Sequence, residues 1–112
     1  MKFEVKRKID SLGRLVIPKA IRDFYRIKKG DTIVLLTARD GILISSADLF
    51  ITNDLPQNST ATVDEMGRFV IPDAFRKEYG FVSQDMLRIV PNETCMLIYK
   101  NNSTVNTDET VA

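Results

Sequence analysis

The chain has 112 residues, 44% of them apolar, and a net charge of +1 at neutral pH. This length favours one domain with a buried core. Histidine is absent and Cys95 is the single cysteine, so Cys/His zinc sites are excluded, and no Gly-rich phosphate loop or evident pair of acids indicates catalysis. We therefore expect no enzyme activity, no metal and no cofactor.

The first half begins with a predicted half-buried strand. Residues 3–9 alternate apolar and polar side chains, which is typical of a strand with one buried face. Asp-x-x-Gly-Arg at residues 10–14 predicts a turn, because aspartate can bond to its own backbone and glycine supplies a positive φ. Residues 15–17 are rich in β-branched side chains and predict a second, short strand.

A short helix and a hairpin complete this half. Pro18 suits the first turn of a helix, which we expect to extend to Tyr25. A turn at 29–31 then leads to a predicted hairpin over residues 32–46. The apolar side of the helix would comprise Ile17, Ala20, Ile21, Phe24 and Tyr25.

The second half repeats the first. With a shift of 54 residues, residues 9–46 lie over residues 63–100 without gaps, and 12 of the 38 positions are identical. Average composition would give roughly two or three identities. The phrase DSLGRLVIP at 10–18 thus recurs as DEMGRFVIP at 64–72. A unit of this size cannot bury its apolar face alone, so the two copies are expected to fold together.

We divide the chain into four parts on this basis. They are a basic half-domain, a connector, a diverged acidic half-domain and a disordered tail, at residues 1–47, 48–59, 60–100 and 101–112. Each half-domain is predicted to have the order β-β-α-β-β. Two of them can close a barrel and remove its exposed edges. We expect a mainly β fold with short helices, in which the apolar start of the connector packs on the barrel. The connector is long enough for a barrel within one chain or one exchanged between chains, and the divergence of the copies favours an intrachain pseudo-dimer.

The charge is divided unevenly between the halves. Residues 1–52 carry 11 Lys and Arg against six acids, a net charge of +5, whereas residues 53–112 carry five against nine, a net charge of −4. A basic half joined to an acidic half indicates a polyanionic partner for the first.

Nothing in the sequence indicates export or a membrane span. There is no run of 18 apolar residues, and the start MKFEVKRKID lacks the apolar core of a secretory signal. We expect a cytoplasmic, nucleoid-associated protein.

The repeated phrases resemble a known family. The stretch RKIDSLGRLVIPKAIRDFYRIKKGDTIVLL at 7–36 resembles the DNA-binding half-domain of the AbrB/SpoVT family of bacterial transition-state regulators, and TVDEMGRFVIPDAFRKEYG at 62–80 looks like a diverged copy. The resemblance implies a swapped-hairpin β-barrel, in which hairpins from two half-domains interleave. In the MraZ relatives both copies belong to one chain, and this chain matches that arrangement in copy number.

The resemblance also implies binding of double-stranded DNA through basic side chains on one face of the barrel. The second copy has Ala61 and Thr62 where the first has Arg7 and Lys8, and Asp73 where the first has Lys19. The first copy is therefore expected to contribute most. The candidate DNA-binding residues are Lys6, Arg7, Lys8, Arg14, Lys19, Arg22, Arg68 and Arg76.

Each of these residues also has a structural interpretation. Arg14 and Arg68 can pair with the aspartate of their own turn, and the helix arginines can lie on a solvated face. The run at 6–8 can protect a strand edge. The convergence of basic groups from the strand end, turn and helix of the first copy favours DNA binding instead.

We predict a transcriptional regulator that reads DNA sequence or shape and forms a homo-oligomer, since one basic half-face offers few contacts. Two alternatives remain open. The chain could be an antitoxin whose tail binds a toxin while the barrel binds the operator. It could also be a protein-assembly module in which oppositely charged halves stack.

Overall fold

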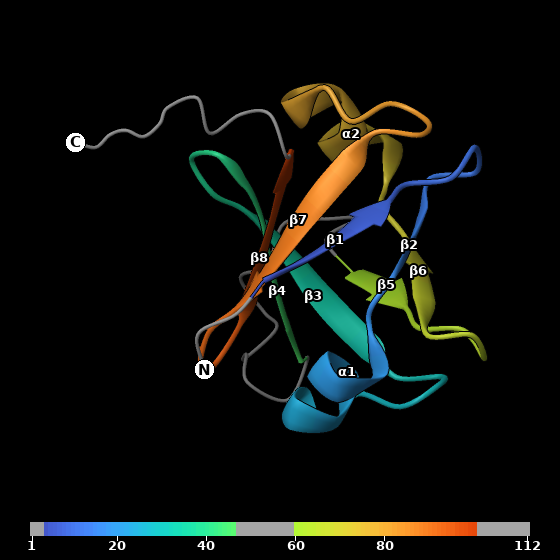
Figure 1. The fold of residues 1–112 in the computed structure, drawn as a ribbon, viewed down its shortest axis with the longest axis vertical. Helices are drawn as coiled ribbons and strands as arrows, with labels where there is room; N and C mark the ends of the chain where they lie inside the picture. The colour runs from blue at the N-terminus through green and yellow to red at the C-terminus, as the bar shows by residue number, and fades with distance from the viewer. Residues whose placement is uncertain (1–3, 47–59, 101–112) are drawn as a thin grey trace.

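The computed structural model describes residues 4–46 and 60–100. The predicted connector and disordered tail lie outside these residues, and so does the expected packing of the connector. Within the described ranges the order strand, strand, helix, strand, strand occurs twice (Figure 1). The first set comprises β1 (Val5–Lys8), β2 (Arg14–Val16), α1 (Lys19–Tyr25), β3 (Thr32–Thr37) and β4 (Gly41–Ser46). The second set comprises β5 (Thr60–Thr62), β6 (Arg68–Val70), α2 (Asp73–Tyr79), β7 (Met86–Pro91) and β8 (Met96–Lys100).

Strands from both halves join in one six-stranded antiparallel sheet, in which the two hairpins lie side by side and each is flanked by the first strand of the other half. The sheet has the order β1-β7-β8-β4-β3-β5. The first strand of each half pairs with the hairpin of the other half, so that Lys8 lies opposite Met86 and Thr62 lies opposite Thr32. Each half therefore completes the sheet of the other, which neither could form alone.

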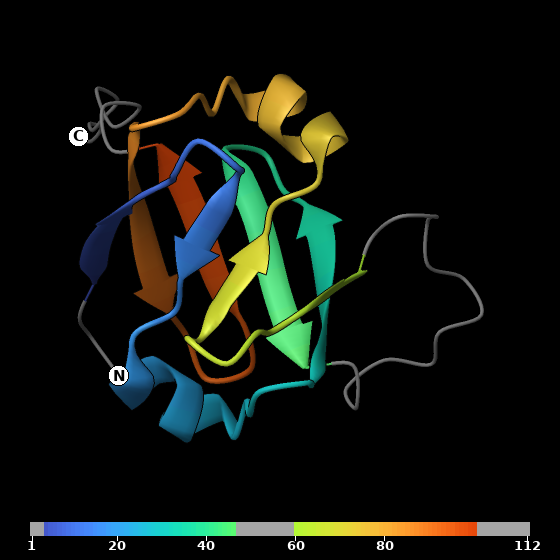
Figure 2. The ribbon, with the colours of Figure 1, turned by 90° about the vertical axis from the view of Figure 1, so that its right-hand side faces the viewer.

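The remaining two strands, β2 and β6, form an antiparallel ribbon in which Leu15 lies opposite Phe69. Figure 2 shows this ribbon in front of the sheet, with α1 and α2 at opposite ends of the molecule. Leu15 and Phe69 are buried toward the sheet. The core fills the space between the two layers, and its largest fully buried side chains also include Ile9, Ile17, Ile21, Ile33, Leu35, Ile42, Ile44, Ile71, Leu87 and Ile89.

The expected closed barrel is wrong in one respect, because the six-stranded sheet ends at β1 and β5 and does not close on itself. Each edge strand ends in an Asp-x-x-Gly-Arg turn that carries the chain away from the sheet and into the ribbon. Two backbone hydrogen bonds close each turn. In the first turn, Asp10 N–H donates to the Arg14 carbonyl at 3.1 Å and Gly13 N–H donates to the Asp10 carbonyl at 3.0 Å; in the second, Asp64 N–H donates to the Arg68 carbonyl at 2.8 Å and Gly67 N–H donates to the Asp64 carbonyl at 3.1 Å. The ribbon strands then pair with each other rather than with the sheet edges.

The first helix buries fewer side chains than the sequence predicted. The first spans seven residues, with Ile21 as its buried residue. Phe24 was expected on the apolar side but is 43% exposed, and Ala20 is exposed as well. A helix of two turns placed at the end of the sheet buries only a narrow stripe, so two of the five residues predicted on its apolar side face solvent.

A tyrosine at the end of each helix binds the hairpin of the other half. The Tyr79 hydroxyl accepts a hydrogen bond from the Ala38 N–H at 3.0 Å and donates to the Ala38 carbonyl at 2.7 Å. The Tyr25 hydroxyl lies within hydrogen-bond distance of the Asn92 and Cys95 carbonyls. Burial raises the pKa of both phenols. These bonds fix each helix to a hairpin far away in the sequence.

Candidate nucleic-acid interface

The β2–β6 ribbon presents one face to solvent. Its inward positions are the buried Leu15 and Phe69, so the alternating positions face outward. In the antiparallel register Arg14 lies opposite Val70, and Arg68 lies opposite Val16. The outward face therefore carries two partly buried arginines and two exposed valines. The exposed turn residues Leu12 and Met66 lie beside it.

The two Asp-x-x-Gly-Arg turns are closed by their own aspartates. One carboxylate oxygen of Asp10 accepts hydrogen bonds from the backbone N–H groups of Leu12 and Arg14, at 2.9 and 2.8 Å. The other accepts from the Arg14 Nε at 2.6 Å. Asp64 holds Arg68 in the same way, with its Nε at 2.8 Å. The structural interpretation of this pair, an aspartate bound to the arginine of its own turn, is therefore present in both copies.

These hydrogen bonds set the charge state of the turns. The backbone N–H and the guanidinium of Arg14 hold the pKa of Asp10 below its ordinary value, and Arg68 does the same for Asp64. Both carboxylates are therefore ionised at neutral pH. Each ion pair uses the arginine Nε, and the terminal nitrogens of Arg14 and Arg68 have no partner among residues 4–46 and 60–100. Those nitrogens remain available to an anion.

The helix arginines are anchored by backbone carbonyls. The Arg22 Nε donates to the Ile17 carbonyl at 2.8 Å, and the Arg76 Nε donates to the Ile71 carbonyl at 2.9 Å. Both side chains are partly buried. The expectation of a merely solvated helix face therefore does not describe them, because each side chain folds back across the start of its own helix.

Each helix arginine lies against the turn of the other half. A Cβ placed on Gly67 would stand 2.6 Å from the Cζ of Arg22, and one placed on Gly13 would stand 2.9 Å from the Cζ of Arg76. Figures 1 and 2 show the same arrangement, with the first turn near α2 and the second turn near α1. The structure thus places Arg76 against Gly13, in the turn that precedes Arg14. It places Arg22 at the opposite end of the ribbon, beside the turn that precedes Arg68.

The basic run on β1 is exposed. Lys6, Arg7 and Lys8 are exposed on an edge strand that leads directly into the first turn. Lys6 lies opposite Arg88 of β7, whose guanidinium pairs with Glu4. Sequence analysis did not identify Arg88 as a cation next to this basic run. The pairing of β1 with β7 joins segments about 80 residues apart, and no local sequence pattern indicates it.

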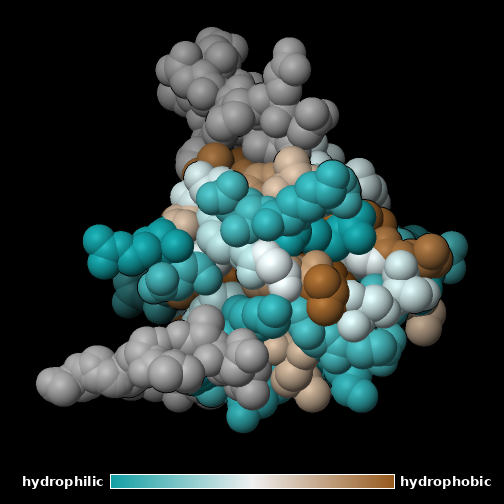
Figure 3. Space-filling view, turned by 90° about the horizontal axis from the view of Figure 1, so that it is seen from above, coloured by the Kyte–Doolittle hydropathy of each residue, from teal (hydrophilic) through white to brown (hydrophobic). Residues whose placement is uncertain are grey.

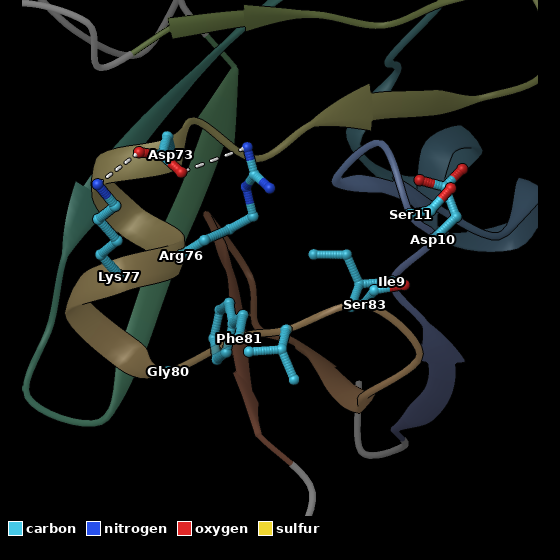
Figure 4. Close-up of a pocket in the computed structure, with 10 residues that line it drawn as sticks. Ile9, Asp10, Ser11, Asp73, Arg76, Lys77, Gly80, Phe81 and Ser83 are labelled. Atoms are coloured by element: carbon cyan, nitrogen blue, oxygen red, sulfur yellow. Dashed lines mark ion pairs between the residues drawn. The ribbon is translucent and has the colours of Figure 1, made fainter.

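Acids accompany some of the candidate residues. Lys19 pairs with Asp23 at 3.0 Å across one helical turn. In the second copy Asp73 lies 3.2 Å from Lys77 and 3.8 Å from the Arg76 guanidinium (Figure 4). The cations of α2 therefore share one carboxylate.

A shallow hollow of about 370 Å³ separates α2 from the first turn. Asp10, Ser11, Asp73, Arg76 and Lys77 contribute its polar lining (Figure 4). Seen from the α2 end, the surface is mostly hydrophilic, with apolar side chains exposed in small patches (Figure 3). Across the described part of the chain, no three His, Cys, Asp or Glu side chains are grouped to hold a metal ion, and no helix is long and apolar enough to span a membrane.

Comparison with known proteins identifies the first half. Residues 6–49 match the family described as antidote-toxin recognition MazE, bacterial antitoxin. Over 40 residues the chain is 50% identical to stage V sporulation protein T of Bacillus subtilis (strain 168). The first half is thus similar to MazE-type antitoxin domains and to stage V sporulation protein T over these residues. The matched segment is 36% of this chain and spans about a fifth of the relative, 22% of its length.

One solved structure is also similar to the chain. It is the solution structure of PHS018 from Pyrococcus horikoshii, with 22% sequence identity and a TM-score of 0.49, and the match covers 88% of this chain and 94% of that one.

Proposed function

We propose that this AbrB/SpoVT-like protein binds double-stranded DNA through the basic side chains at the two ends of its ribbon, and thereby regulates transcription in the cytoplasm. One observation carries the proposal. The four arginines at positions 14, 22, 68 and 76 are each anchored through Nε, so their terminal nitrogens are held in place for an incoming anion. Anchoring lowers the entropy lost on binding and suits bidentate contact with phosphate or a guanine edge.

The arrangement of the chain supports the swapped-hairpin architecture and the division into half-domains at 1–47 and 60–100. The support is the exchange of edge strands, since β1 pairs with β7 and β5 pairs with β3. On this proposal the chain is an intrachain pseudo-dimer, and a homo-oligomer would supply further contacts along the duplex.

Electrostatics is expected to dominate the affinity. A cation that neutralises a phosphate releases a counterion, so binding weakens steeply as salt rises. No long helix is present in the described ranges to enter the major groove, because α1 and α2 have seven residues each. Sequence choice would then rest on arginine contacts to base edges together with the shape and flexibility of the duplex.

The test is binding to a random-sequence duplex, measured by fluorescence anisotropy at several salt concentrations. Arg14→Ala should weaken binding about tenfold or more and lower the salt slope by about one. Arg39→Ala is the matched control, because it removes one exposed arginine from the β3–β4 hairpin, away from the ribbon. Equal effects of the two variants, with both folded by circular dichroism, would contradict the assignment.

A second candidate function has its own support. The matched family is described as a bacterial antitoxin, which favours a protein partner in addition to DNA. A small toxin that co-purifies at fixed stoichiometry from the native host would establish this function. If the protein instead forms large assemblies at low salt that disperse at high salt, stacking of the oppositely charged halves is the better explanation.

A further inference from the structure

The two turn glycines are in contact with arginines from the opposite half of the chain. Gly13 and Gly67 have φ values of +81° and +79°. A methyl group on Gly67 would stand 2.6 Å from both the Cζ and Nε of Arg22, and one on Gly13 would stand 2.9 to 3.1 Å from three guanidinium atoms of Arg76. Real Cβ atoms essentially never come within 3.0 Å of such atoms, so an added methyl group at either position would displace the guanidinium from the place that glycine leaves open for it.

Backbone hydrogen bonds fix the same contact from the other side. The Ile17 N–H donates to the Gly67 carbonyl at 2.9 Å, and the Ile17 carbonyl accepts from the Arg22 Nε at 2.8 Å. Glycine, isoleucine and arginine therefore form a closed loop that joins the two halves. The second loop is equivalent, with Ile71 bound to the Gly13 carbonyl at 2.9 Å and to the Arg76 Nε at 2.9 Å.

We propose that Gly13 and Gly67 are positioning residues that seat the helix arginine of the opposite half, so that the chain carries two composite DNA-contact sites. One site combines Arg14 with Arg76, and the other combines Arg68 with Arg22. The DNA part of this inference rests on the proposed function, whereas the seating of the arginines does not. Neither site can be formed by one half-domain, and the acidic half contributes an arginine to each.

The two helix arginines differ in the carboxylates around them. In the Arg14–Arg76 site, Asp73 lies 3.8 Å from the Arg76 guanidinium and partly neutralises it. No carboxylate lies within 4 Å of the Arg22 guanidinium among the described residues, since Asp23 pairs with Lys19. Among the described residues, the Arg22 guanidinium is therefore less neutralised by carboxylates than the Arg76 guanidinium.

A matched pair of glycine variants tests whether Gly67 positions the Arg22 guanidinium. Gly67→Ala introduces backbone strain together with the clash against Arg22. Gly30→Ala is the control, because Gly30 has a φ of +85° but no atom within 4 Å of the added methyl group. We expect Gly67→Ala to lower the affinity for a random-sequence duplex about tenfold and the salt slope by about one, while Gly30→Ala changes neither. A slope unchanged in folded Gly67→Ala would overturn the composite DNA site.

Thermal unfolding without DNA tests the contact between Gly67 and Arg22 independently of binding. Gly67→Ala should lower the Tm by about 5 °C more than Gly30→Ala, and this excess should vanish in an Arg22→Ala background, where the clashing group is gone. In an Arg76→Ala background the excess should persist. Coupling of Gly67 to Arg76, or additivity with Arg22, would overturn the seating across halves.

The two measurements separate the inference from the proposed function. If wild type fails to bind duplex DNA at low salt, the proposed function and the composite DNA sites are both wrong. Thermal unfolding of the single and double variants would still decide whether Gly67 positions the arginine of the opposite half.

Discussion

At the scale of single residues, the turn and helix arginines show how one side chain can be structural and still offer a binding group. Arg14 closes its turn through Nε, with a side chain 31% exposed, and Arg22 binds a backbone carbonyl through the same atom. Guanidinium has five donors in a fixed plane, so one anchored donor orients the remaining ones. Lysine could not do both, because its ammonium has no such plane.

The charge next to Arg76 gives a prediction at this scale. Asp73 occupies the position that Lys19 has in the first copy. Asp73→Lys should raise affinity for a random duplex several-fold at low salt and steepen the salt dependence, because it frees the Arg76 guanidinium and adds a cation. Anisotropy titrations at two salt concentrations measure this. Glu93→Lys in the β7–β8 hairpin makes the same charge change away from the ribbon, and an equal gain there would point to net charge alone.

The turn aspartates predict how stability depends on pH. The folded-state pKa values of Asp10 and Asp64 are lowered, so the ionised carboxylates stabilise the fold above their ordinary pKa. That stability is lost as the pH falls through the lowered folded-state values. Urea unfolding between pH 5 and pH 2 should show the loss. In Asp10→Asn/Asp64→Asn the dependence in this range should be weaker, and an unchanged profile would contradict the role of the turns.

At the scale of elements, the tyrosines explain how helices of seven residues remain in place. Isolated helices of this length are unstable in water, so their stability must come from tertiary contacts. Tyr25 and Tyr79 each reach a hairpin of the opposite half, and each packs partly buried against the core. Helix, turn and hairpin are therefore one cooperative unit across the two halves.

Removal of one phenol oxygen tests this unit. Tyr79→Phe removes the hydroxyl that donates to the Ala38 carbonyl and leaves the Ala38 N–H with the Gly41 carbonyl alone, so it should lower the free energy of unfolding by about 1 kcal/mol. Tyr99→Phe is the control, since its hydroxyl forms no hydrogen bond within the described residues. Chemical denaturation of both variants gives the comparison, and equal stabilities would show that the Tyr79 hydroxyl contributes nothing.

At the scale of the whole molecule, each half provides what the other lacks. The hairpin of each half takes its outer strand from the other half, and the ribbon takes one strand from each. The interface between the halves is therefore the core itself, which explains why both copies keep apolar residues at their buried positions while their surfaces have diverged in charge.

This mutual dependence predicts the behaviour of an isolated half. Residues 1–47 alone should fold only as a homodimer, in which a second copy replaces β5–β8. The half should then unfold when it is diluted below its dimerisation constant, whereas the full chain should stay folded on dilution because both halves belong to one chain. Circular dichroism melts at several concentrations, with sedimentation equilibrium, measure this. A folded monomer of the half would contradict the exchange of strands.

Much of this organisation follows from local sequence pattern. Thr32–Thr37 forms the predicted strand, and α1 ends at Tyr25 as expected. These features depend on period, turn residues and a proline, all within a few positions of one another. The exposure of Phe24 was not predictable, because it depends on how little of a short helix the end of the sheet covers. The open sheet was not predictable either, since it depends on where the turns redirect the chain.

The sequence by itself determined the order of elements in each half, the Asp–Arg turns and the charge difference between the halves, since these depend on neighbouring residues and composition. Only the tertiary structure decided which half supplies which partner. The turn of one copy meets the helix arginine of the other because the antiparallel ribbon sets the two turns at opposite ends. No local pattern encodes that contact between positions about 45 to 63 residues apart, because it arises from packing two units around one core.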